Sequence, residues 1–277
     1  MSSQPTSSQP MSSEAMSYQT LRFEVVDSIA TITIDRPDDA NALNARMAAE
    51  LHDVALRCAD DAGVRAVIVT GNGRMFCAGG DLKDMHAQGD GRHAYITRMA
   101  TDLHNALARF THMDAPVVMA VNGTAAGAGF SLALAGDYVI AADKAKFVSA
   151  YTAAGLTPDG SSTYYLAKHV GLLRAKELMF TNRVLSADEA CAWGIVNRVV
   201  AGEQLMDEAR KMAASFAAGP TRAYGELKEL LLTAYAESFE TQLDRETRAI
   251  AGMQKTHDGP HGIESFLNKR KPDFKGH

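Results

Sequence analysis

Two glycine-rich turns, each placed after a run of apolar residues, are the first candidates for chemistry in this sequence. Residues 116–121 are apolar and bounded by Pro and Asn-Gly, which predicts a buried strand. Gly127, Ala128 and Gly129 follow, and residues 130–135 have helical composition. A strand, a glycine turn and a helix start leave backbone N–H groups free to bind a developing oxyanion. Close packing of small residues against a sheet would explain this turn equally well.

A second turn of the same kind makes the oxyanion interpretation stronger. Residues 65–70 (RAVIVT) predict another buried strand, and Ala78, Gly79 and Gly80 precede Asp81 and an expected helix. The two corners could each direct one N–H at a single carbonyl oxygen.

Asp159 is the acidic residue that could act beside these corners. It lies in a Pro-Asp-Gly turn, where Asp is common for structural reasons alone. A carboxylate at that point could also take a proton from one carbon and return it to another. The turn by itself does not distinguish the two roles.

Composition restricts the class of protein. The chain has 277 residues, 46% hydrophobic and 22% charged, which suits one substantial core or a core with an appendage. The net charge of -5 argues against nucleic-acid binding. Three scattered cysteines give no disulfide framework or metal spacing and favour a reducing, cytoplasmic location. No apolar run reaches the length of a membrane span.

The pattern of elements predicts an α/β fold in three parts. Residues 1–17 are rich in Ser, Gln and Pro and are expected to be a disordered tail. Residues 18–200 are expected to form the core, and residues 201–277 a helical region. Strands are predicted at 21–26, 29–35 and 137–142, and helices at 44–58, 92–112, 161–170, 174–180, 186–193, 204–218, 221–235, 239–253 and 263–269.

Several motifs together resemble the crotonase, or enoyl-CoA hydratase/isomerase, superfamily. They are NALN, FCAGGDL, AVNGTAAGAGFSLALAGD, AKF and FLNKRKPDFKG, and they span roughly residues 20–276 in order. Within the superfamily, AAGAG, AKFVSAY, GLTPDG and ETQLDRE look most like ring-1,2-epoxyphenylacetyl-CoA isomerases. The segment LMFTNRVLSADEACAWGIVNRVV is also similar to 4-chlorobenzoyl-CoA dehalogenase.

The resemblance implies a fold, a substrate and an assembly. The fold would be a spiral of ββα units with two roughly perpendicular sheets and C-terminal helices that form a homotrimer or a dimer of trimers. The substrate would be an acyl-CoA thioester, with coenzyme A as part of the substrate and no separate cofactor or metal. The oxyanion donors would be the N–H groups of Gly80 and Ala128. The residues expected to bind substrate are Ala42, Ala78, Asp81, Leu82, Lys83, Phe130, Ser131, Tyr151, Phe266 and Lys269.

Departures from the family pattern favour one reaction over another. The two glutamates that hydratases use fall on Ser131 and Tyr151 here, so we expect an isomerase with Asp159 as the base. A dehalogenase-like enzyme with Asp159 as nucleophile also fits, because His104 matches a histidine of that enzyme. The dehalogenase has Trp at the position of Tyr151 and Phe near the position of Gly80, and these two differences weaken the match. The same fold would also suit an enoyl-CoA hydratase, an RNA-binding protein or an inactive scaffold.

Overall fold

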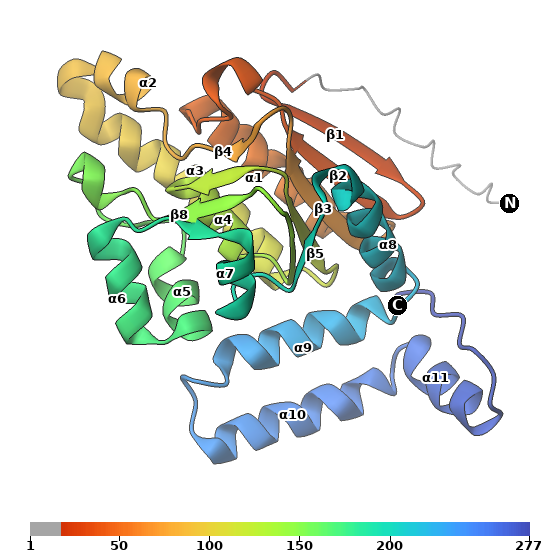
Figure 1. Cartoon of the computed structure of the whole chain (residues 1–277). Helices are drawn as coiled ribbons and strands as arrows, with labels where there is room; N and C mark the ends of the chain where they lie inside the picture. The colour runs from red at the N-terminus through yellow and green to blue at the C-terminus, as the bar shows by residue number, and fades with distance from the viewer. Residues whose placement is uncertain (1–17) are drawn as a thin grey trace, which may run out of the picture.

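The computed structural model describes residues 18–277, and the predicted disordered tail lies outside the described residues. Two sheets are surrounded by helices, and three C-terminal helices lie together beside this body (Figure 1). The predicted α/β core with a C-terminal helical region is confirmed.

The larger sheet has six strands in the order β1-β2-β3-β5-β7-β10. The first two predicted strands pair with each other as an antiparallel hairpin, and every other neighbouring pair is parallel. These strands are β1 (Leu21–Val26), β2 (Ile29–Ile34), β3 (Ala66–Gly71), β5 (Val117–Val121), β7 (Tyr138–Ala142) and β10 (Arg198–Val200).

The smaller sheet has four short strands in the order β4-β6-β8-β9. They are β4 (Met75–Cys77), β6 (Thr124–Ala126), β8 (Lys146–Val148) and β9 (Leu185–Ser186). Three times in succession the chain gives one strand to the larger sheet and the next to the smaller one: β3 then β4, β5 then β6, β7 then β8. This alternation is the expected spiral of ββα turns.

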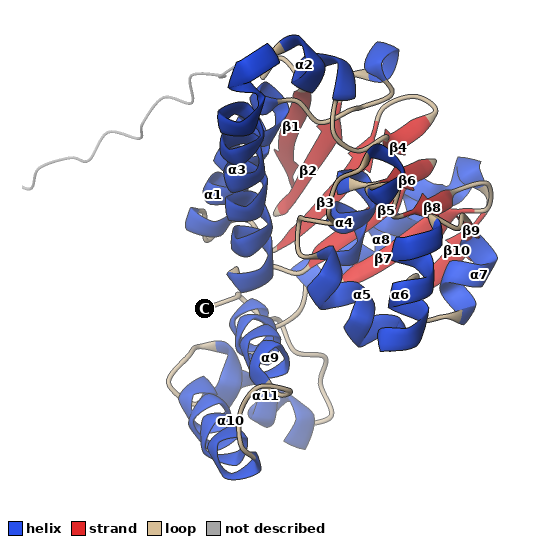
Figure 2. Cartoon of the chain, turned by 90° about the vertical axis from the view of Figure 1, so that its left-hand side faces the viewer, coloured by secondary structure: helices blue, strands red, loops and turns tan. Residues whose placement is uncertain are grey.

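Helices cover both faces of the larger sheet. On one face lie α1 (Ala45–Asp60) and α3 (Arg92–His112), which run side by side in Figure 2, and on the other lies α8 (Leu205–Ala217). Because successive strand residues point to opposite faces, Val67 of β3 packs toward α1 and α3 while Ile68 packs toward α8. Asn44 begins α1 by accepting a hydrogen bond from the Met47 amide at 2.9 Å.

The remaining helices of the core follow the strands of the spiral. They are α2 (Leu82–Ala87), α4 (Ala128–Leu134), α5 (Ser162–Val170), α6 (Leu172–Thr181) and α7 (Ala187–Ala192). Ser186 caps the N-terminus of α7, because its side chain accepts a hydrogen bond from the Glu189 amide. Among residues 18–277, no helix combines the length and apolarity needed to cross a bilayer.

The C-terminal arm consists of α9 (Thr221–Thr233), α10 (Phe239–Met253) and α11 (Asp258–Leu267). The last helix begins five residues earlier than the predicted 263–269. Lys228 of α9 attaches the arm to the core, because its ammonium lies 2.8 Å from the Asp137 carboxylate and donates to the Phe110 carbonyl at 2.8 Å. Burial raises the pKa of Asp137, and the Lys228 charge acts against that rise.

Gly129 allows α4 to lie directly on β4. A Cβ atom built at this position would be 2.6 Å from Cys77 Cβ and would also strike the Cys77 carbonyl oxygen. Any side chain would therefore push the helix and the second glycine corner away from the smaller sheet.

We predict that Gly129→Ala destabilises the protein by about 1–3 kcal/mol, the usual cost of overpacking a core. The matched control is Gly252→Ala in α10, where an added Cβ meets no atom within 4 Å. Alanine favours a helix over glycine by about 1 kcal/mol, so the control should be neutral or stabilising. Urea unfolding of both variants measures the difference, and equal midpoints would contradict the prediction.

Candidate active site

The two predicted glycine corners lie against each other. Gly79 has φ 97° and Gly127 has φ 49°, conformations that favour glycine. A Cβ built at Gly79 would be 2.9 Å from the Ala126 carbonyl oxygen and 3.4 Å from Gly127 Cα. Glycine at both positions brings the two chain segments close enough for their next residues, Gly80 and Ala128, to line one cavity.

The amides of Gly80 and Ala128 have no hydrogen-bond acceptor within residues 18–277. Leu43 forms a parallel β-bridge with the segment around Gly80. In this bridge the Leu43 amide donates to the Gly79 carbonyl at 2.7 Å, and the Asp81 amide donates to the Leu43 carbonyl at 2.8 Å. The Gly80 amide takes part in neither hydrogen bond. Ala128 is the first residue of α4 and has no acceptor one turn earlier in the helix. Two unpaired donors therefore border the cavity.

The cavity has a volume of about 270 Å³ and a mainly apolar wall. Among the described residues, Asp159 is the only carboxylate that lines it, and Tyr151 and Thr157 supply the hydroxyls. The apolar side chains of the wall are Leu43, Leu82, Met85, Ile96, Met99 and Leu156, together with several alanines. Met85, Met99 and the predicted substrate residue Tyr151 thus lie in one wall.

Asp159 is held by two hydroxyl side chains, those of Tyr151 and Ser131. The Tyr151 hydroxyl donates to Asp159 Oδ1 at 2.7 Å, and Ser131 Oγ lies 2.8 Å from the Tyr151 oxygen and 2.9 Å from the Asp159 carbonyl oxygen. Each hydroxyl has one proton, so Tyr151 gives its proton to the carboxylate and Ser131 gives its own to Tyr151 or to the carbonyl. Burial raises the pKa of Tyr151, and the neighbouring Asp159 charge raises it further. Tyr151 therefore remains a donor at neutral pH.

His104 also contacts Asp159, which the sequence alone did not establish. Its Nε2 atom lies 3.5 Å from Asp159 Oδ2, and it accepts a hydrogen bond from the Gly160 amide at 3.1 Å. The signal in the sequence was the match of His104 to a histidine of 4-chlorobenzoyl-CoA dehalogenase.

The other predicted substrate residues divide into two groups within the core. Ala78 and Leu82 line the cavity. Phe130 does not, because it packs in the core 5.7 Å from the Phe147 ring, and Ser131 is fully buried behind Tyr151.

Three more predicted contacts lie near the first corner but outside the cavity lining. Asp81 caps α2 and pairs with Arg36 at 3.2 Å. Arg36 also donates to the Ala42 carbonyl. Lys83 is exposed at the start of α2.

Phe266 and Lys269 do not reach this cavity within one chain. Both lie at the end of α11, which Figures 1 and 2 show in the C-terminal arm, away from α2 and α4. The Phe266 side chain is 84% exposed.

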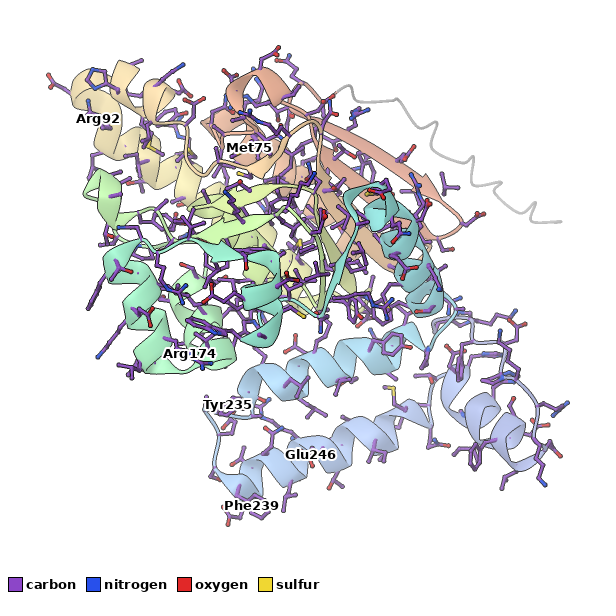
Figure 3. The ribbon with its side chains drawn as sticks, in the orientation of Figure 1. Met75, Arg92, Arg174, Tyr235, Phe239 and Glu246 are labelled. Atoms are coloured by element: carbon purple, nitrogen blue, oxygen red, sulfur yellow. The ribbon has the colours of Figure 1, made fainter. Side chains whose placement is uncertain are left out.

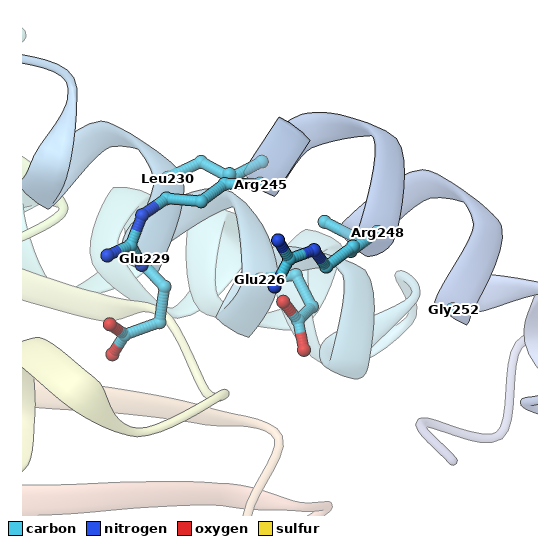
Figure 4. Close-up of a pocket in the computed structure, with 7 residues that line it drawn as sticks. Glu226, Glu229, Leu230, Arg245, Arg248 and Gly252 are labelled. Carbon is cyan, nitrogen blue, oxygen red and sulfur yellow. The ribbon is translucent and has the colours of Figure 1, made fainter. Parts of the chain in front are cut away.

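A second cavity, of about 310 Å³, lies between α9 and α10 and has a charged lining. Glu226 and Glu229 of α9 and Arg245 and Arg248 of α10 line it (Figure 4). Arg245 pairs with Glu237, so its charge is already compensated outside the cavity. In residues 18–277, no group of three His, Cys, Asp or Glu side chains is arranged to hold a metal ion.

We predict that the Tyr151 phenolate forms only well above about pH 10, the ordinary range of tyrosine, because burial and the Asp159 charge oppose ionisation. Alkaline titration at 295 nm of the protein and of Tyr151→Phe gives the absorbance of this one phenol by difference. Tyr164→Phe, which removes an exposed phenol outside the cavity, is the control. A Tyr151 contribution that appears at or below pH 10 would refute the arrangement.

Known proteins with similar sequences include enzymes with different named activities. The chain is 38% identical to the 1,2-epoxyphenylacetyl-CoA isomerase of Escherichia coli strain K12, over 91% of this chain and 97% of the relative. It is 38% identical to a probable enoyl-CoA hydratase of Rhodobacter capsulatus, over 92% of this chain and 98% of the relative. A 4-chlorobenzoyl coenzyme A dehalogenase-2 of Arthrobacter is 33% identical, over 84% of this chain and 86% of the relative.

Solved structures give the same family. A putative enoyl-CoA hydratase of Streptomyces coelicolor superposes with a TM-score of 0.90 at 29% identity, covering all of both chains. An enoyl-CoA hydratase of Polaromonas superposes with a TM-score of 0.88 at 32% identity, over 92% of this chain and 99% of that one. The enoyl-CoA hydratase/isomerase family model matches residues 24–277. With this match and the paired glycine corners, the chain belongs to the enoyl-CoA hydratase/isomerase family.

Proposed function

We propose that the protein is an acyl-CoA isomerase that shifts a double bond or rearranges an epoxide, with Asp159 as its base. One observation carries the proposal: among the described residues, Asp159 is the only carboxylate of a cavity that also contains two unpaired backbone amides. Proton transfer between two carbons needs one base and a group that stabilises the intermediate.

The amides of Gly80 and Ala128 would bind the thioester carbonyl oxygen. When a proton leaves the neighbouring carbon, negative charge gathers on this oxygen, and both N–H groups then bind it more strongly. Each such donor typically contributes about a hundred- to a thousandfold in rate.

Asp159 Oδ2 is the atom suited to proton transfer. Tyr151 donates to Oδ1 and leaves Oδ2 free of that donor. Oδ2 takes a proton from one carbon as the C–H bond breaks and the enolate forms. The same O–H then delivers the proton to a second carbon as the enolate collapses. The substrate is rearranged, no water is consumed, and Asp159 ends as a carboxylate.

Hydration is the less favoured reaction because the described part of the chain gives the cavity no second carboxylate. Water addition in this family uses two, and the corresponding positions have the hydroxyls of Ser131 and Tyr151. Both hydroxyls are already engaged with Asp159 and with each other.

A dehalogenase-like reaction is the second candidate, and His104 is the observation in its favour. Asp159 would attack an aromatic ring carbon as a nucleophile, and a base would then activate water to hydrolyse the ester. His104 Nε2, 3.5 Å from Asp159 Oδ2, is near enough to serve as that base. Chloride release from 4-chlorobenzoyl-CoA tests this second candidate.

We predict that Asp159→Asn lowers isomerisation by at least about a hundredfold, within the usual contribution of a general base, because the amide keeps the shape and loses the basicity. The substrates to compare are 3-enoyl-, 2-enoyl-, epoxyphenylacetyl- and 4-chlorobenzoyl-CoA. In ¹⁸O-labelled D₂O, an isomerase rearranges its substrate and incorporates no ¹⁸O into the product.

The matched control is Asp188→Asn, which makes the same change at an exposed position in the first turn of α7. It should retain full activity. Efficient hydration of 2-enoyl-CoA, or an Asp159→Asn variant with nearly normal isomerisation, would refute the assignment.

We further propose that the active protein is a trimer or a pair of trimers, in which the C-terminal arm of one copy contacts another. The arm exposes large apolar side chains, including Tyr235 and Phe239 at its tip (Figure 3), which are 85% and 73% exposed. In such an assembly, Phe266 and Lys269 would contact the coenzyme A bound to a neighbouring copy. The apolar contact would bury surface that is costly to leave in water.

We predict that sedimentation velocity at micromolar concentration gives a particle of three or six chains. The reason is the exposed apolar surface of the arm, which a single chain leaves in contact with solvent. A stable monomer under these conditions would rule out the proposed assembly.

A further inference from the structure

The peptide group between Asp159 and Gly160 is held on both edges by side chains from different helices. Its carbonyl oxygen accepts from Ser162 Oγ of α5 at 2.9 Å and lies 2.9 Å from Ser131 Oγ of α4. Its N–H donates to His104 Nε2 of α3 at 3.1 Å. Gly160 is buried with φ 59°, and an added Cβ would be 2.9 Å from Ser131 Cβ, so the turn has little room to move.

The two contacts of His104 Nε2 require different protonation states. Accepting from the Gly160 amide requires a lone pair on Nε2, which in a neutral ring places the proton on Nδ1. Pairing with Asp159 Oδ2 by a hydrogen bond requires a proton on Nε2. One nitrogen cannot do both at once.

We propose that His104 is a positioning residue for Asp159: as a neutral imidazole protonated on Nδ1, it fixes the Gly160 amide and leaves Oδ2 without a donor. This inference rests on the proposed role of Asp159 as the base. A carboxylate oxygen that accepts no strong hydrogen bond is the more basic one, so the tautomer of His104 maintains both the position and the reactivity of Asp159.

Protonation of His104 would reverse this arrangement. The imidazolium would donate from Nε2 to Asp159 Oδ2 and would lose the Gly160 contact. Within residues 18–277, Asp159 is the only carboxylate in contact with the ring. On its other side, His104 shares a cavity with His112, Tyr164 and Tyr165, and His112 is bound to Glu229. The arrangement therefore requires the neutral ring, because an imidazolium would occupy Oδ2 and release the turn.

The test compares His104→Gln with His104→Leu in the full chain. Gln offers an amide oxygen that can accept from Gly160 and does not titrate, whereas Leu keeps similar bulk without an acceptor. We expect Leu to lower kcat by about tenfold to a hundredfold, the cost of a small misplacement of a catalytic group, with KM unchanged. Gln should restore most of kcat, because its amide oxygen can replace Nε2 as the acceptor for the Gly160 amide.

Nitrogen NMR of ¹⁵N-histidine-labelled protein reads the tautomer directly, with His104→Gln used to assign the signals. At neutral pH, His104 should show a protonated Nδ1 and an unprotonated Nε2. A protonated Nε2, or equal kcat in the Leu, Gln and wild-type proteins, would overturn the inference.

Comparison of the Asp159 and His104 variants separates this inference from the proposed function. If Asp159→Asn remains active, the base is misassigned, and the tautomer still reports whether His104 binds Gly160. If Asp159→Asn is inactive while His104→Leu is as active as wild type, the proposed base stands and the role of His104 is refuted.

Discussion

The site depends on the direct contact of two stretches of backbone. Gly79 and Gly127 meet so closely that a Cβ on Gly79 would be 3.4 Å from Gly127 Cα. Gly129 packs against Cys77 with equally little room for a side chain. These contacts place two strand-to-helix corners side by side, each followed by an amide with no acceptor in residues 18–277. Because the proposed donors are backbone N–H groups, Ala128 would serve as well as glycine. The conformation of the preceding glycine matters more than the side chain of the donor.

The polar groups of the cavity are arranged around a single charge. A mainly apolar wall of 270 Å³ makes each additional buried carboxylate costly, and neighbouring carboxylates repel each other. Hydroxyls at Ser131 and Tyr151 avoid that repulsion and donate protons toward Asp159. The hydroxyls of Ser131 and Tyr151 therefore help to position the single carboxylate of the cavity.

The C-terminal arm is the part of the chain on which the proposed assembly rests. It is attached to the core at Lys228 and Asp137 but leaves large apolar side chains in contact with solvent. The lining of the cavity comes from one chain. The residues expected to hold coenzyme A at Phe266 and Lys269 lie in the arm, which gives a physical reason for a neighbouring copy to complete the binding surface.

Much of the fold and part of the site followed from local patterns in the sequence. Long apolar runs predicted β3, β5 and β7, and helical periodicity predicted α1 and α3, because burial of one face leaves a clear repeat. The four strands of the smaller sheet are only two or three residues long, which is too short for an alternating apolar pattern to be recognised in the sequence. Glycine turns after predicted strands also identified both corners before the structure located them.

Only the tertiary structure decided which of the nominated side chains meet. Phe130 and Ser131 are adjacent in the sequence, yet one packs in the core against Phe147 and the other reaches Tyr151, because neighbouring residues on a helix point in different directions. His104 is far from Asp159 along the chain, and no pattern within α3 indicates that pairing. The sequence by itself determined the family, the corners and the candidate acid. The contacts between distant segments decided how that acid is held, because they depend on how the helices pack.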